Sequence, residues 1–282
     1  MKNIVVGIDF SPSSLKALKH AIAISIKTNG KLHLVWVKTP GTVNGLSKNN
    51  VKSITKKAND LLAELVETCQ KECPKSQIAS VILEGRVAEE LTKYADNLED
   101  SVIVMGTHGA SGEEEDFAGS NALKATALAD VPLFVMHQDL QTNSDLITIL
   151  APIDTSFETL QKMKMVIKCA KAFAAKVLLL GLVSPELPEV QHTINIQLRN
   201  ASNMCADANI RYDASSISIT GNAAKAVIDF AKAHDVNLVA VMKEEEEDFS
   251  DFWLGRTTRQ LLNHTPMPLL IIPNVSYCYS SK

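Results

Sequence analysis

The sequence lacks several features that would place it in a common class of protein. Its five cysteines are odd in number and include no C-x-x-C pair, so neither a disulfide framework nor a zinc site is indicated. No apolar run approaches the roughly 20 residues that a membrane-spanning helix needs. The net charge of -4 offers no basic face for nucleic acid. We therefore expect no membrane and no nucleic-acid partner. Cys69 and Cys73, four residues apart, are either a redox pair or buried free thiols.

Short catalytic motifs are also missing. The sequence has no G-x-x-x-x-G-K-[ST], which excludes a P-loop, and no H-E-x-x-H or G-x-S-x-G. We accordingly name no catalytic residue and no metal ligand. Met1-Lys2-Asn3 runs straight into an apolar strand pattern, which leaves no room for a signal peptide. The expected location is cytoplasmic.

Apolar spacing predicts strands that alternate with helices. Ser11 and Pro12 are typical of a helix start, and Asn29-Gly30 of a helix end. Alternation of this kind implies parallel strands joined by right-handed crossovers, an α/β doubly wound fold. The first part of the chain is expected to have strands near 31–37, 78–83, 101–105 and 132–136, and helices near 12–28, 51–65, 87–95 and 121–128.

The chain then repeats itself. Residues 146–154, LITILAPID, match residues 3–9, NIVVGID, so that Asp154 falls on Asp9. Residues 219–231 match 83–95 in the same way. Such a long period indicates two whole domains rather than a solenoid. We expect two tandem doubly wound parallel-sheet domains, Rossmann-like in form, spanning residues 1–140 and 145–282.

Residues 102–120, VIVMGTHGASGEEEDFAGS, end one buried strand and open the next helix. The carboxyl ends of parallel strands line the crevice in which α/β folds bind ligands. Gly106 and Gly109 let the backbone approach a ligand, and the helix that begins after Gly119-Ser120 attracts anions. The stretch is therefore either a phosphate cradle or an ordinary strand-to-helix loop.

The spacing G-x2-G-x9-G-S resembles the nucleotide motif of the universal stress protein family. The likeness extends to the opening IVVGIDFSPSSLKALKHA and to residues 129–136, ADVPLFVM, and so covers essentially all of residues 1–137. The resemblance implies a tandem universal stress protein that binds ATP or another adenine nucleotide, with or without Mg²⁺, in a regulatory role in the stress response. It implies at most slow ATP hydrolysis. An interaction scaffold with a relic glycine loop is the alternative.

The resemblance also assigns roles within the predicted site. Asp9 corresponds to an acidic contact to the ribose, although a turn or cap role explains it as well, and Val37 to a residue that packs on adenine, although plain core is the alternative. Gly106, Gly109, Gly119 and Ser120 correspond to the phosphate cradle, with His108 as a further contact. The complete predicted set is Gly7, Ile8, Asp9, Val37, Met105, Gly106, His108, Gly109, Gly119, Ser120 and Asn121.

Two departures from the family pattern concern the phosphates. Ala122 stands where the family often has a hydroxyl, and Glu113–Asp116 place four carboxylates in the loop. Three interpretations of these carboxylates stay open: they point into solvent, they repel phosphate, or they recruit Mg²⁺.

The second half has lost the cradle. Met242 falls on Gly106, Glu245 on Gly109 and Arg256 on Ser120, while Gly255 alone matches Gly119. Because methionine and glutamate block a close approach of the backbone, we expect one nucleotide per chain, in the N-terminal half.

The last strand of each half, at 132–136 and 268–272, is apolar, and the resemblance implies that it lies at a sheet edge. An apolar edge invites pairing unless another segment covers it. The resemblance further implies that the two domains dock about a pseudo-twofold axis with these strands antiparallel, so we expect the chain to be an intramolecular dimer. Further association into a homodimer stays open.

Overall fold

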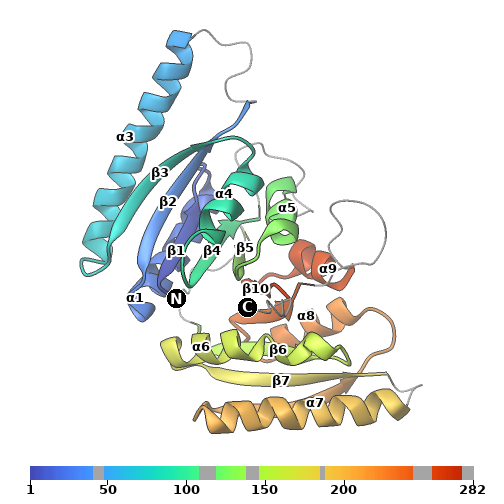
Figure 1. Ribbon diagram of the computed structural model, residues 1–282. Helices are drawn as coiled ribbons and strands as arrows, with labels where there is room; N and C mark the ends of the chain where they lie inside the picture. The colour runs from blue at the N-terminus through green and yellow to red at the C-terminus, as the bar shows by residue number, and fades with distance from the viewer. Residues whose placement is uncertain (41–47, 108–118, 138–145, 185–187, 244–255, 275–282) are drawn as a thin grey trace, which may run out of the picture.

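The computed structural model describes residues 1–282 apart from 41–47, 108–118, 138–145, 185–187, 244–255 and 275–282. Its described strands form one ten-stranded sheet in the order β3-β2-β1-β4-β5-β10-β9-β6-β7-β8. The order is symmetric about the centre, because β6 to β10 take the places of β1 to β5. Figure 1 shows the two halves of the chain on either side of the central pair of strands.

The first half alternates strands and helices as its apolar spacing predicts. Ser11 caps the first helix by accepting a hydrogen bond from the Ser14 N–H, and Asn29 ends it with a φ of 53°. The elements are β1 (Asn3–Gly7), α1 (Pro12–Thr28), β2 (Lys31–Lys38), α3 (Lys48–Glu72), β3 (Ile78–Glu84), α4 (Val87–Asp96), β4 (Ser101–Gly106), α5 (Ser120–Leu128) and β5 (Leu133–Met136).

The second half repeats this order with one change. Where α1 starts directly after the loop that follows β1, the second half has a short 3₁₀ helix and only then an α-helix. Its elements are β6 (Thr148–Ile153), η1 (Phe157–Leu160), α6 (Met163–Phe173), β7 (Lys176–Val183), α7 (Pro188–Asp207), β8 (Tyr212–Ser218), α8 (Ala223–Ala233), β9 (Leu238–Met242), α9 (Arg256–His264) and β10 (Leu269–Ile272). Two doubly wound α/β units follow each other in the chain, as the sequence predicts.

The two halves meet through β5 and β10. Within each half the strands pair in parallel, whereas β10 pairs antiparallel with β5, with Leu270 opposite Phe134. This confirms the antiparallel edge-to-edge docking expected from the apolar last strands. Each edge covers the other, so the backbone groups of both strands are paired within the chain.

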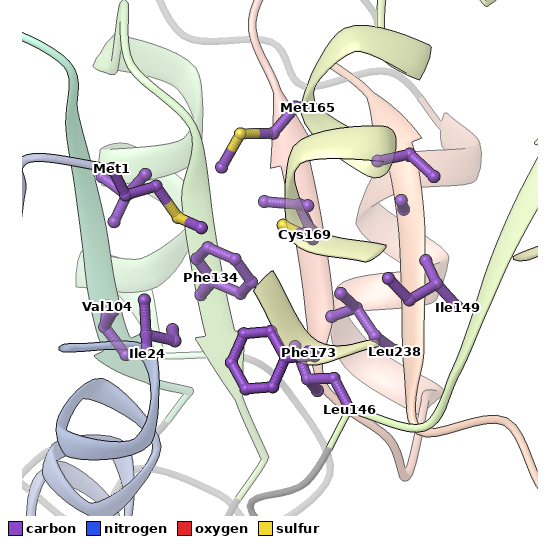
Figure 2. Packing of buried hydrophobic residues seen from close by; sticks show 14 of the residues in the cluster. Met1, Ile24, Val104, Phe134, Leu146, Ile149, Met165, Cys169, Phe173 and Leu238 are labelled. Carbon is purple, nitrogen blue, oxygen red and sulfur yellow. The ribbon is translucent and has the colours of Figure 1, made fainter. Parts of the chain in front are cut away.

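A continuous apolar core crosses this junction. Phe134 and Cys169 are fully buried, and Figure 2 shows Phe134 among side chains from both halves, including Val104 from β4 and Phe173 from α6. Full burial of one such aromatic side chain stabilises the fold by roughly 1.5 to 3 kcal/mol. The halves therefore share one core rather than only a hydrogen-bonded strand pair.

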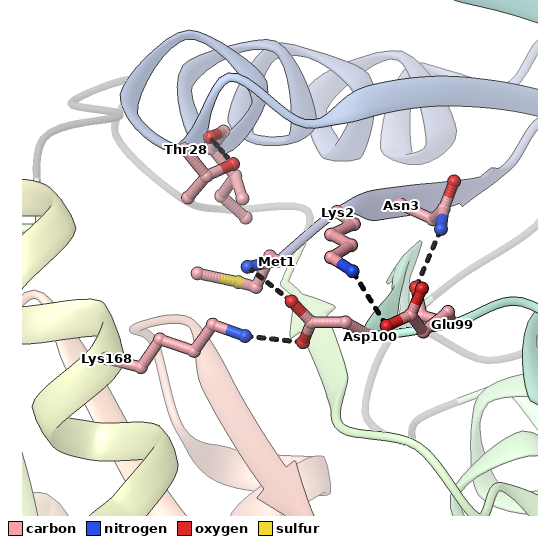
Figure 3. Close-up of polar contacts among 8 residues, drawn as sticks. Met1, Lys2, Asn3, Thr28, Glu99, Asp100 and Lys168 are labelled. Atoms are coloured by element: carbon pink, nitrogen blue, oxygen red, sulfur yellow. Dashed lines mark hydrogen bonds and ion pairs between the residues drawn. The ribbon is translucent and has the colours of Figure 1, made fainter.

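Polar contacts add to the junction. Asp100, at the start of β4, accepts from the Met1 amine at 3.2 Å and pairs with Lys168 of α6 (Figure 3). Burial raises the pKa of Asp100, but the hydrogen bonds from Lys168 and the amine outweigh it and hold the pKa below its usual range. A further contact between the halves joins Lys243 to the end of α5: its Nζ donates to the carbonyl oxygens of Ala127 and Ala129, at 3.0 and 3.3 Å.

The cysteines Cys69 and Cys73 of α3 and its following turn are buried free thiols. Burial raises the pKa of Cys69 to about 12, and the Cys73 thiol donates to the Cys69 carbonyl at 2.9 Å. Protonated, buried thiols react slowly, so this arrangement favours a packing role over a redox pair. Separately, among the helices that the structure describes, none combines the length and hydropathy needed to cross a bilayer.

Candidate functional site

A pocket opens at the carboxyl ends of β1, β2 and β4, where the starts of α4 and α5 face it. We call it the N-terminal pocket. Every predicted site residue that the structure describes lines it, while His108 and Gly109 lie outside the described residues, as do Glu113–Asp116. Its lining comprises Gly7, Ile8, Asp9, Ser14, Val35, Trp36, Val37, Val87, Leu91, Met105, Gly106, Thr107, Gly119, Ser120, Asn121 and Ala122.

Asp9 lies in a tight turn between β1 and α1. Its Oδ1 accepts from the Ser11 N–H at 3.0 Å, and its own N–H donates to Ser14 Oγ at 3.4 Å. The next residue, Phe10, has a φ of 64°, a left-handed conformation that is uncommon for a bulky side chain. Asp9 is thus a turn residue, which is the alternative to a ribose contact that the sequence left open, and it also borders the pocket.

Gly106 ends β4 against the first turn of α1. A Cβ built on it would lie 2.1 Å from Ser13 Oγ and 3.0 Å from the Ser13 carbonyl carbon. Such distances are far below ordinary contact, so only glycine allows the helix to start this close to the strand. Gly106 therefore shapes the wall of the pocket through packing, a role that the spacing of glycines in the sequence does not reveal.

The start of α5 closes another side of the pocket. Gly119 is the N-cap, and its N–H donates to the Thr107 carbonyl at 2.6 Å, which ties the end of β4 to the helix. The Gly119 N–H therefore has its hydrogen-bond partner within the protein. What the helix start presents to the pocket is Ser120 and Asn121, and first-turn N–H groups have no partner within their own helix.

An apolar slot forms the rest of the N-terminal pocket. It is built from side chains of β2, β4 and α4, with Val37, Leu91 and Met105 in one buried apolar cluster. Sequence reasoning identified Val37 and Met105 but missed Trp36, Val87 and Leu91. The spacing of Val87 and Leu91 by one helical turn places both on one face of α4, which is the signal that points to them.

Among the described residues that line this pocket, Asp9 is the sole ionisable side chain. The described part of the chain also contains no cluster of His, Cys, Asp and Glu that could hold a metal ion. An arrangement with an apolar slot, one carboxylate and a helix start suits the binding of a ligand with an apolar ring and an anionic end. It supplies no acid and base pair.

The second half repeats the turn but not the glycine. Asp154 Oδ1 accepts from the Ser156 N–H at 2.8 Å, and the Asp154 N–H donates to Thr159 Oγ1 at 3.3 Å, as Asp9 does with Ser11 and Ser14. The Thr107 N–H bonds to Met136 and the Lys243 N–H to Ile272, so Met242 takes the place of Gly106.

These equivalences support the loss of the cradle expected for the second half, because α9 begins with Arg256 where α5 begins with Ser120. Glu245 and Gly255 lie outside the described residues. A separate cavity of about 460 Å³ remains at the corresponding position. We call it the C-terminal pocket.

Comparison with known proteins identifies relatives of both halves. The model of the universal stress protein family matches residues 1–137 and again 147–273. A universal stress protein of Methanocaldococcus jannaschii is 30% identical over 143 residues, which is 49% of this chain and 82% of that protein. Universal stress protein A homolog 1 of Coxiella burnetii is 28% identical over 138 residues, 46% of this chain and 93% of that protein.

A solved structure shares the whole architecture. The crystal structure of a universal stress protein from Archaeoglobus fulgidus superposes with a TM-score of 0.79 at 17% identity, and the match covers 96% of this chain and 98% of that one. At this identity the likeness concerns the fold, including the arrangement of two halves in one chain.

Proposed function

The chain belongs to the universal stress protein family, and we propose that its N-terminal pocket binds an adenine nucleotide, with ATP as the first candidate. The observation that carries the proposal is the meeting of three features in one pocket: an apolar slot, the Asp9 carboxylate and the start of α5. Each suits a different part of a nucleotide. The protein then acts as a regulatory binding module of the stress response.

The base is assigned to the apolar slot. Val37 and Leu91 lie on opposite elements, β2 and α4, and both line the pocket, so a flat ring can enter between strand and helix. The ribose lies next to Asp9, whose carboxylate is suited to accept hydrogen bonds from sugar hydroxyls, as acidic residues do in other dinucleotide folds. The Asp9 turn fixes the direction of that carboxylate through the Ser11 N–H.

The phosphates are assigned to the start of α5. Ser120 offers a hydroxyl and backbone N–H, and the helix dipole favours negative charge at this end. Gly106 lets α1 pack close against the end of β4, which shapes the adjoining wall of the pocket. Bound Mg²⁺ would neutralise phosphate charge, and the carboxylates of Glu113–Asp116 are candidates to recruit it.

Binding rather than turnover is proposed because the described lining offers no second ionisable group to act as a general base beside Asp9. Slow hydrolysis therefore has no dedicated machinery in this part of the chain. The proposal confines the nucleotide to the N-terminal half, since Met242 replaces Gly106 in the other half.

A pair of matched variants tests the assignment. Asp9→Asn keeps an oxygen for the Ser11 hydrogen bond but removes the charge, and Asp154→Asn makes the same change in the second half. Loss of a charge-assisted hydrogen bond costs roughly 1.5 to 3 kcal/mol, about 10- to 100-fold in Kd. Titration calorimetry with ATP and Mg²⁺ should show this weakening for Asp9→Asn and none for Asp154→Asn.

Equal effects of the two variants would contradict the placement in the N-terminal pocket. Two further measurements separate the alternatives. Mass spectrometry of small molecules released on denaturation should find an adenine nucleotide, whereas a scaffold with a relic loop would release none. Phosphate release at a measurable rate from bound ATP would instead favour a slow hydrolase.

A further inference from the structure

Lys162, the residue just before α6, is buried in the wall of the C-terminal pocket, with 2% of its surface exposed. The hydrogen bonds of the two turns pair Thr159 with Ser14, so the residue three positions further on, Lys162, corresponds to Ala17. A charged side chain therefore stands where the first half has a buried alanine. The structural repeat makes this difference specific to the second half.

The Lys162 ammonium is incompletely paired within the described part of the chain. Its Nζ donates to Thr159 Oγ1 at 3.0 Å, and no described carboxylate lies within ion-pair distance. A lysine has three N–H donors, and burying a charge without partners costs several kcal/mol. Burial lowers the pKa of Lys162 to about 8, while the charge of Asp154 acts in the opposite direction. Below that pH the ammonium is charged, and the described carboxylate that acts on it, Asp154, lies beyond ion-pair distance.

The same cavity contains a second unpaired polar atom. Asn274, just beyond β10, lines the C-terminal pocket, and its buried Oδ1 has no hydrogen-bond partner among the described residues. Buried polar atoms are nearly always paired, so an unpaired amide oxygen and a half-paired ammonium in the lining of one cavity indicate that the cavity suits a polar group.

Lys243, the other cation that lines this pocket, is already engaged, because its Nζ bonds to Ala127 and Ala129 in the first half. Lys162 is thus the group with donors to spare. The other charged groups in the described lining are two carboxylates, Asp154 and Glu158. Their negative charge disfavours a polyanion such as a triphosphate and tolerates a ligand of single charge better.

Part of the remaining wall is apolar. Leu182, Val227 and Leu261 line the cavity, and its volume of about 460 Å³ lies within the range of roughly 300 to 1,000 Å³ found for small-molecule sites. Met242 takes the position of Gly106, whose missing side chain leaves room for Ser13 in the first half. The two pockets therefore differ in the ligand that they suit.

We propose that the C-terminal pocket binds a small organic acid with an apolar body, whose carboxylate pairs with Lys162. The apolar body contacts Leu182, Val227 and Leu261. Thr159 orients the ammonium, and Asn274 adds a polar amide to the same cavity. This site is independent of nucleotide binding in the N-terminal pocket.

The test uses the full chain and a panel of acetate, hexanoate and benzoate, followed by ligand-observed NMR and calorimetry. Hexanol serves as the neutral counterpart of hexanoate, and inorganic phosphate as an anion without an apolar body. Lys162→Met removes the charge while keeping an apolar side chain of similar length, and such replacements of buried charge are often neutral or stabilising. Lys232→Met changes an exposed lysine and is the matched control.

Hexanoate or benzoate should bind more tightly than hexanol and phosphate, and Lys162→Met should weaken that binding at least tenfold while Lys232→Met leaves it unchanged. A thermal melt that is not lowered in Lys162→Met shows that the fold is intact, and unchanged ATP binding in the same variant separates this site from the N-terminal one. No binding by any of the three acids, equal binding in Lys162→Met, or phosphate binding as tightly as the acids would overturn the proposal.

Discussion

Phe134 and Leu270 lie opposite each other in the antiparallel pair that joins β5 to β10 at the middle of the sheet. Both side chains are fully buried and belong to one apolar core that extends into both halves. The last strand of each half thus has the other as its neighbour. The fold of either half is completed by its copy in the same chain.

Replacing Phe134 with lysine should open this junction. The change places an unpaired charge in a fully buried position, and such an ion cannot be desolvated without a cost of several kcal/mol. Small-angle scattering should show a larger radius of gyration for Phe134→Lys. The conservative change Phe134→Leu, which keeps this core position apolar, should retain the compact shape. Unaltered scattering in Phe134→Lys would count against a junction that depends on this core.

Gly106→Ala should destabilise the protein, because the added Cβ would lie 2.1 Å from Ser13 Oγ. Overpacking of this kind typically costs about 1 to 3 kcal/mol. Urea denaturation measures the free energy of unfolding. In a background of Ser13→Gly, which removes the obstructing side chain, the same change should cost clearly less. Equal costs in the two backgrounds would show that the close approach of α1 is not what requires glycine.

His33 should make stability fall on acidification. Its ring bonds to Tyr94 and Asn3 at 2.9 and 3.0 Å, and burial, with a smaller effect of Lys31, lowers its pKa to about 4. Between these two pKa values the histidine of the unfolded chain, with a pKa near 6.5, is protonated, whereas His33 of the folded chain is neutral. Stability is therefore lost as the pH falls from about 6.5 to 4, and is unaffected by this group above that range.

The loss attributed to His33 should amount to roughly 1 to 2 kcal/mol between pH 7 and 5. Because other groups titrate as well, the informative quantity is the difference between the wild type and His33→Gln, measured by urea denaturation at both pH values. That difference should move in favour of the variant at pH 5. A difference that stays constant with pH would mean that the folded protein accepts the proton.

Much of the fold follows from local sequence signals. Ser11-Pro12 and Asn29-Gly30 bound α1 as predicted, and the recurrence of the Asp9 strand end at Asp154 marks the duplication directly in the sequence. The helix ends and the duplication depend on short-range patterns, which the sequence carries directly. The docking of the two halves could also be predicted, but only in part from burial: two apolar strands without charge need a cover, and the family resemblance supplied their edge position and antiparallel direction.

The pocket contents were harder to predict. The glycine spacing indicates where Gly106 lies, but not that Ser13 is the group that excludes a side chain there. Leu91 of α4 and Val37 of β2 come from elements far apart in the chain, so their place in one apolar cluster depends on how α4 packs on β2. Lys162 does not differ in residue type from a surface lysine, and its burial is apparent only from its correspondence to the buried Ala17 of the first half.

The central claim is that one adenine nucleotide binds per chain, in the N-terminal pocket. The most direct measurement is the calorimetric stoichiometry of ATP binding in the presence of Mg²⁺, compared between the wild type and Gly119→Val, whose side chain would stand at the start of α5. The account predicts a stoichiometry near one that is lost in the variant. Two sites per chain, or unchanged binding in Gly119→Val, would contradict it.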